Sequence, residues 1–358
     1  MYQQFKKSIA VFSKDIIFLF TFFLKLISNC LVFLFFMKHS SPLLIIILSF
    51  FLSAFAVAQT SGSRFKTVDD YVKSLGSLDT LNMGTISYIV TKKFPDNMDK
   101  VRAIFDWIAY NISFDCKAAR SNGNEKPDPE NVLKFRKTNA SGYAALFQDM
   151  CSVIKIRCLT VDGYAKNNVE QINEKPDEFN HTWVVVQLGL SPETWYYVDP
   201  TWGSGYTDDK VIVYTKAYND AYFFADKTIF NYQHFPDNTA WVLGANSTKN
   251  IKDFFALPLV KDYAYEYGIR NISPLNGNIK ASTKKPVSFS FKLKGNTKID
   301  IVALMIGTDK KKRIKTVDYT LNNSMVSFNY KFDEEDSYPV TVLINNKPVL
   351  GYFAEISE

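Results

Sequence analysis

The chain reads Asn180-His181-Thr182-Trp183 where it enters one predicted strand, and Tyr197-Val198-Asp199-Pro200-Thr201-Trp202-Gly203 where it leaves the next. If these two strands pair as neighbours, His181 and Asp199 face each other. A carboxylate that fixes the tautomer of a histidine and stabilises its charged form makes the base half of a nucleophilic triad. Taken alone the pair is weak support for catalysis, because a single histidine is more often a structural residue.

Helical and strand patterns surround these two stretches. The pattern is helical from Val68 to Ala109, with a turn and helix-start signal at 94–97, and a second helix is predicted from near Ala140 to Ile154. Strand-like runs follow at 157–161, 183–188 and 195–198. Helices followed by an antiparallel sheet predict an α+β fold.

From about Asn276 the pattern changes to short strands. Alternating or β-branched runs occur at 287–293, 298–306, 314–321, 325–332 and 340–344. Turn residues separate them at intervals of about 8–12 residues, which is typical of a β-sandwich. We therefore predict a first domain at 67–272 and an Ig-like β-sandwich at 276–358. The basic run 310–313 is interpreted as a solvated hairpin tip.

The first 58 residues indicate a targeting segment. The stretch from Ile16 to Phe36 is apolar apart from Lys25 and a few small polar residues, and about 20 such residues suffice to cross a bilayer. A second block starts at Met37 with a basic residue, continues with an apolar run and ends with Ala56-Val57-Ala58, the pattern of a secretory signal peptide. We predict a signal peptide at 37–58 that is cleaved after Ala58.

Residues 1–36 have two interpretations. If Met37 is the true start, they form an upstream extension that is never made, and we favour this reading. Otherwise they form a poor membrane helix that gives possible membrane association at the N-terminus. In both cases we expect residues 59–358 to be exported, and so to be periplasmic, envelope-associated or secreted.

The charge distribution excludes a strongly basic nucleic-acid-binding protein. Of the net charge of +6, residues 1–58 carry +4, so the remaining 300 residues carry only +2. Those 300 residues contain three cysteines and two histidines, with no Cys-x-x-Cys pair, so we predict no metal site and no cofactor. The sequence does not indicate an oligomeric state.

The stretch from about 98 to 260 resembles the transglutaminase-like superfamily, closest to its kyphoscoliosis-peptidase type. The resemblance rests on ordered matches at 100–108, 111–115, 132–137, 142–147, 163–166, 181–183, 199–206 and 234–241. It implies a papain-like α+β core. In this family a cysteine that opens a helix is the nucleophile, and a histidine and an aspartate complete the triad. Carried over, His181 is the base and Asp199 orients it.

The sequence departs from the family at the nucleophile. Residues 138–143 read Thr-Asn-Ala-Ser-Gly-Tyr, so that Ala140 stands where the resemblance implies the cysteine and Thr138 replaces a glycine. A methyl group cannot attack a carbonyl carbon. The residues expected around the cleft or in its frame are Ser141, Tyr143, Trp183 and Trp202.

Three other residues are candidates for a displaced nucleophile: Cys151, Ser141 and Cys116. Cys151 lies eleven residues after Ala140, about 16 Å along a helix, and is interpreted as a small buried hydrophobic residue. Cys158 is a candidate thiol or disulfide partner for it, and the sequence leaves their disulfide state open. Ser141 points about 100° away from Ala140 around the helix. Nothing in the spacing places Cys116 beside His181.

Three functional readings follow. The first is an exported, catalytically inactive transglutaminase-like protein whose cleft binds a peptide or protein. The second is an active cysteine- or serine-type peptidase, or a protein-glutamine acyltransferase, with Ser141 or Cys116 as the nucleophile. The third is a purely structural protein of the cell envelope. We favour the first, because Ala140 replaces the residue that the chemistry needs.

Overall fold

The structure is a computed structural model, and it describes residues 64–358 except 77, 122–125, 209, 246–247, 249, 296 and 309–310. The expectations for residues 1–36 and for the signal peptide at 37–58 lie outside the described residues. Residues Arg64–Glu358 form one compact unit. Within the described part of the chain, no helix has the length and apolar character needed to cross a membrane.

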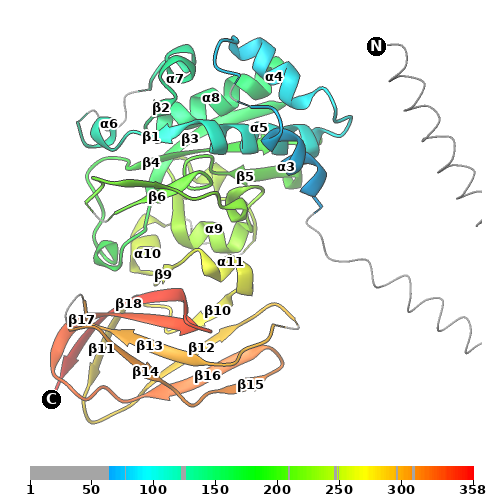
Figure 1. Ribbon diagram of the computed structural model, residues 1–358. Coiled ribbons are helices and arrows are strands. Elements are labelled where there is room, and N and C mark those ends of the chain that lie inside the picture. The colour runs from blue at the N-terminus through cyan, green and yellow to red at the C-terminus, as the bar shows by residue number, and fades with distance from the viewer. Residues whose placement is uncertain are drawn as a thin grey trace, which may run out of the picture. The chain divides into compact units, whose positions relative to one another are not determined.

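A group of helices forms the first part of the fold, labelled as in Figure 1. They are α3 (Lys66–Lys73), α4 (Met83–Thr91), α5 (Asn97–Asn111), α6 (Cys116–Ser121), α7 (Pro129–Phe135) and α8 (Ala140–Val153). Asp96 starts α5, because its side chain accepts hydrogen bonds from the backbone N–H groups of Met98 and Asp99. The predicted start signal at 94–97 is therefore confirmed.

A four-stranded antiparallel sheet lies against α8. Its strands are β3 (Arg157–Ala165), β4 (His181–Gln187), β5 (Trp195–Val198) and β8 (His234–Pro236), in the order β5-β4-β3-β8. Helix α8 packs on β3 and β4 (Figure 1). The apolar side chains between them, Val184 and Val186 of β4 and Leu146, Phe147 and Met150 of α8 among them, form the first core.

Shorter elements complete this part of the chain. Two-stranded sheets pair β1 (Ser113–Phe114) with β2 (Lys137–Thr138) and β6 (Gly205–Thr207) with β7 (Tyr214–Lys216). The later helices are α9 (Lys227–Gln233), α10 (Ile251–Ala256) and α11 (Tyr263–Tyr267), and the 3-10 turns are η2 (Val169–Gln171), η3 (Pro192–Thr194), η4 (Asp220–Tyr222) and η5 (Thr239–Trp241).

Two packed sheets form the C-terminal region. One has the order β10-β12-β16-β15 and the other contains β11-β18-β17-β13-β14. The strands are β10 (Arg270–Ser273), β11 (Asn278–Ser282), β12 (Val287–Lys292), β13 (Val302–Ile306), β14 (Arg313–Thr316), β15 (Thr320–Asn322), β16 (Met325–Tyr330), β17 (Asp336–Ile344) and β18 (Lys347–Ser357). Their inward side chains form a second core. We call this region the sandwich.

The sandwich is joined to the first part by backbone pairing. Strand β9 (Leu259–Val260) pairs with β18, so that Leu259 lies opposite Gly351. A Cβ atom on Gly351 would lie 2.7 Å from Cγ1 of Val169 in η2, which is too close. Only glycine therefore allows η2 to approach β18 at this distance.

The α+β prediction is confirmed, and the strand at 195–198 has the predicted bounds. The helical pattern from 68 to 109 comprises α3, α4 and α5. One element prediction is wrong, because the single run 314–321 is divided between β14 and β15, which belong to different sheets. Residues 311–312 of the basic run lie between β13 and β14 and Arg313 begins β14, whereas residue 310 is outside the described residues. The boundary between 272 and 276 remains a prediction.

Candidate functional site

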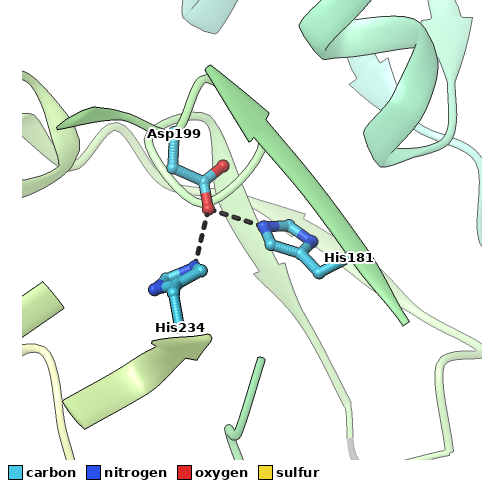
Figure 2. A group of neighbouring side chains, drawn as sticks. All are labelled: His181, Asp199 and His234. Atoms are coloured by element: carbon cyan, nitrogen blue, oxygen red, sulfur yellow. Dashed lines mark hydrogen bonds and ion pairs between the residues drawn. The ribbon is translucent and has the colours of Figure 1, made fainter. Parts of the chain in front are cut away.

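His181 and Asp199 meet at the centre of the first part of the fold. Strands β4 and β5 are antiparallel neighbours, His181 begins β4, and Asp199 follows β5 directly. The His181 Nε2 and Asp199 Oδ2 atoms are 2.6 Å apart (Figure 2). The sequence therefore places the two side chains correctly, and the structure brings them into direct contact.

Asp199 is fully buried and is held from both sides. Its Oδ1 atom accepts hydrogen bonds from the backbone N–H groups of Thr201 and Trp202, at 2.9 and 3.0 Å. Burial by itself would raise the pKa of Asp199, but the neighbouring His181 and His234 rings lower it well below its usual range. Asp199 is therefore an ionised carboxylate with its orientation fixed by backbone groups.

His234 is the third member of the cluster. Strand β8 pairs with β3, with His234 opposite Ala165, and the His234 Nε2 atom lies 3.2 Å from Asp199 Oδ2 (Figure 2). Burial lowers the pKa of His234 to about 4, so its ring is neutral at neutral pH. The sequence resemblance included residues 234–241 but assigned His234 no role in the site. This matched stretch was the sequence signal that could have identified His234 as a site residue.

The hydrogen bonds decide the tautomers. An ionised carboxylate only accepts hydrogen bonds, so the Nε2 atoms of His181 and His234 must both carry hydrogens that they donate to Asp199 Oδ2. The Nδ1 atom of His181 is left on the side of the ring that faces away from Asp199 (Figure 2). It is this edge of the ring that can act on a bound molecule.

Ala140 is the first residue of α8. Asn139 is the N-cap, and its side chain accepts a hydrogen bond of 3.0 Å from the Gly142 N–H group. Gly142 lies tightly against Thr138, because a Cβ atom on Gly142 would lie 1.8 Å from the Thr138 hydroxyl oxygen. The position that the resemblance assigns to the nucleophile is thus at a helix N-terminus, where a thiolate would be stabilised, but it carries a methyl group.

A single cavity connects these residues. Its volume is about 850 Å³, and Asn139, Ala140, Ser141, His181 and Trp202 are among the residues that line it. Other lining residues come from β6 and from the residues around β9, and Pro348 of the sandwich contributes as well. Ala140 and His181 therefore face one cleft, whose walls come from both parts of the fold.

The predicted frame residues have different positions. Trp202 lines the cavity, with its ring centre 5.3 Å from that of His181 and 4.5 Å from that of His234. Trp183 is fully buried behind the His181 ring, at 6.3 Å between ring centres. Tyr143 is also fully buried, and its hydroxyl donates a hydrogen bond of 2.8 Å to the backbone oxygen of Ile112. Trp183 and Tyr143 are thus supporting residues.

The alternative nucleophiles lie in unfavourable surroundings. The Ser141 hydroxyl is buried and lies 3.2 Å from Asn139 Oδ1, to which it donates a hydrogen bond. Cys116 begins α6, and burial raises the pKa of its thiol, which lowers the thiolate fraction. Cys151 and Cys158 are buried free thiols that contact each other, so these two residues are neighbours without a disulfide bond.

The three clustered side chains also supply the donor set of a metal site. One ligand atom each from His181, Asp199 and His234 lies within 4.8 Å of the others. Both ring nitrogens are directed at the same carboxylate oxygen, however, and already form hydrogen bonds with it. The geometry is explained by these hydrogen bonds, and an ion would have to displace them.

Comparisons with known proteins agree with this architecture. Residues 85–200 match the transglutaminase-like superfamily. The chain is 30% identical over 275 residues to the kyphoscoliosis peptidase of Mus musculus, covering 68% of this chain and 41% of that protein. It is 31% identical over 254 residues to the kyphoscoliosis peptidase of Homo sapiens, covering 67% of this chain and 37% of that protein.

A more distant similarity involves hillarin of Drosophila melanogaster, which is 23% identical over 225 residues, covering 59% of this chain and 26% of that protein. The chain therefore spans less than half the length of each of these three relatives.

Proposed function

We propose, from the premise that the chain contains a domain of the transglutaminase-like superfamily, that its cleft binds a peptide segment of a partner protein without catalysing acyl transfer. The absence of acyl transfer follows from the type of residue at position 140. In the acyl-transfer chemistry of this superfamily a nucleophile attacks a carbonyl carbon and a histidine removes its proton. Here the base and its carboxylate are present, but the side chain at the helix N-terminus is a methyl group.

The observation that carries the proposal is Ala140, which lines the same cavity as His181. The alternative nucleophiles do not restore the reaction, because Ser141 is buried in a hydrogen bond and the pKa of Cys116 is raised by burial. The cleft itself is kept open, with a volume of about 850 Å³ and a mixture of polar and aromatic walls. Such a cleft has the size and chemistry to hold a peptide segment.

The first test is an activity assay of the full chain for transamidation and peptide hydrolysis. We expect no turnover above the rate of the His181→Ala variant. Turnover that His181→Ala abolishes would show that another residue acts as the nucleophile, and would refute the inactive reading. Thiol- and serine-directed probes would then identify that residue by His181-dependent labelling of Cys116 or Ser141.

The second test restores the thiol. Ala140→Cys places a cysteine at the start of α8, beside the cavity that His181 lines. We expect this variant to react with iodoacetamide faster than Cys116, and His181→Ala in the same background to slow that reaction. A thiol that reacts no faster than Cys116 would show that the site no longer supports a thiolate. The matched control is Ala119→Cys, at another point of the cavity wall.

We also propose that the protein is exported, since residues 37–58 have the basic start, apolar run and Ala-x-Ala end of a signal peptide. N-terminal sequencing of the protein from its native cells tests this. The proposal expects a mature chain that begins at Gln59. A chain that retains residues 37–58 would contradict it.

A further inference from the structure

We propose that the cleft binds a peptide carboxylate, held between the N-terminus of α8 and the Nδ1 edge of His181. This inference rests on the proposed peptide-binding function and deepens it by naming the group that is recognised. The carboxylate would occupy the place that a thiolate holds in a site with cysteine at position 140. It comes from an acidic side chain or from a peptide C-terminus, which offer the same chemistry.

The helix end provides the first half of the site. Helix α8 has 14 residues, and its macrodipole places partial positive charge at Ala140. Asn139 caps the N–H group of Gly142. Within the described residues, the backbone N–H group of Ala140 has no hydrogen-bond partner. An anion at this point would therefore find a free donor as well as the favourable end of the dipole.

His181 provides the second, independent half. Its side chain is 94% buried, yet it lines the cavity, and in the described part of the chain its Nδ1 atom has no hydrogen-bond partner. The ring carries a hydrogen on Nε2 that is committed to Asp199. A second hydrogen on Nδ1 gives a cation that the ionised Asp199 stabilises from the opposite edge. That N–H group would point at the bound carboxylate and form a charge-assisted hydrogen bond.

The methyl group of Ala140 leaves this end of the cleft without a negative charge from residue 140. With cysteine at this position, the His181 cation would pair with a thiolate of the protein itself. With alanine, the chain supplies no negative charge there, so the donors of His181 and of α8 are left for a ligand.

The same donors discriminate against a carboxamide. A glutamine side chain presents one acceptor oxygen and an NH₂ group that only donates, so one of its ends would face a donor of the site. A glutamate side chain presents acceptors at both oxygens. The remaining charged lining groups are balanced and do not exclude an anion; they are Arg120, Lys166, Lys261, Glu170, Asp208 and Asp262.

Calorimetric titration of the full chain with four peptides tests the inference. Acetyl-Gly-Gly-Glu-Gly-Gly-amide is compared with its Gln counterpart, and acetyl-pentaglycine with a free C-terminus is compared with its amide. We expect the carboxylate member of at least one pair to bind at least about tenfold more tightly, the lower end of the effect of one hydrogen bond to a charged group. The pair that discriminates identifies the source of the carboxylate.

Two variants locate the effect. His181→Gln retains a donor toward Asp199 but removes the cation, so it should reduce the preference for carboxylate over amide to less than about twofold. Ala140→Asp supplies a carboxylate from the chain itself and should remove the preference in the same way. Ala119→Asp adds the same charge at another point of the cavity wall and should retain the preference.

A measurement on the unaltered chain gives a result that does not depend on whether the variants fold. The ¹⁵N signal of His181 Nδ1 should shift when the carboxylate peptide is added and should not shift with its amide. Equal binding of both members in each pair, or a preference that survives His181→Gln, would overturn the inference but leave peptide binding in place. Absence of binding by all four peptides would overturn the carboxylate site, whereas peptide binding itself would then be contradicted only if longer, unrelated peptides also failed.

Discussion

Replacing Gly142 with alanine should destabilise the protein, although the intrinsic preference of a helix predicts the opposite. Alanine is favoured over glycine inside a helix by about 0.8–1.0 kcal/mol. At Gly142, however, the new Cβ atom would lie 1.8 Å from the Thr138 hydroxyl oxygen and 2.9 Å from the Thr138 Cβ atom. The second contact involves an atom that no side-chain rotation can move away.

The balance can be estimated from these two effects. Overpacking of a tight site costs about 1–3 kcal/mol, and occasionally more. Because both Thr138 and Gly142 are buried and Thr138 has no space for relief at its Cβ atom, we take the upper part of that range. After the gain from helix preference, the net loss of unfolding free energy is about 1–2 kcal/mol.

The assay is urea unfolding, read as a fall in the midpoint at an unchanged slope. Gly84→Ala is the matched control, because Gly84 is also helical and exposed, and a Cβ atom there meets only the Asn82 side chain at 3.5 Å. It should raise the stability by about 0.5–1 kcal/mol. In a Thr138→Gly background, Gly142→Ala should become stabilising too. A Gly142→Ala protein as stable as the Gly84→Ala protein would refute the steric argument.

Three further predictions follow from buried polar groups. Burial lowers the pKa of Lys166 to about 7, so between pH 7 and about 10 the unfolded chain binds a proton that the folded chain lacks. The free energy of unfolding should therefore rise by up to about 1.4 kcal/mol per pH unit in this range. Urea unfolding of Lys166→Met should show no such rise. Tyr143→Phe should cost about 0.5–1.5 kcal/mol by urea unfolding, because it removes one of the two hydrogen bonds to the backbone oxygen of Ile112, which keeps the Lys216 ammonium group as a donor. Trp183→Ala should cost about 3–5 kcal/mol by the same assay, since Trp183 is fully buried, and a smaller loss would show that the core collapses around the gap.

The site pair could be predicted from sequence because strand ends determine it. His181 starts one strand and Asp199 ends the next, and the antiparallel pairing of neighbouring strands brings such ends together. The start of α8 at Ala140 could also be predicted from the sequence, since Asn139 is a favourable N-cap residue. These are local signals joined by one short-range pairing.

His234 could not be placed by the same reasoning. It lies 35 residues after Asp199, and it reaches the site because β8 pairs with β3 rather than with a strand adjacent in sequence. A three-residue strand has no periodicity to recognise. The division of 314–321 was missed for a related reason, because alternation indicates which face a residue occupies but not which of two sheets its strand joins.

The pairing of β9 with β18 makes the sandwich a wall of the cleft, since Pro348 at one end of β18 lines the cavity that His181 also lines. If a bound ligand contacts both walls, its binding and the docking of the two parts are thermodynamically linked, and each strengthens the other by the same free energy. A ligand that contacts both walls would make them unfold at a shared, higher temperature. By the same linkage, substitutions in the turn before Pro348 can change the affinity of the cleft for its ligands without altering any residue of the His181 cluster.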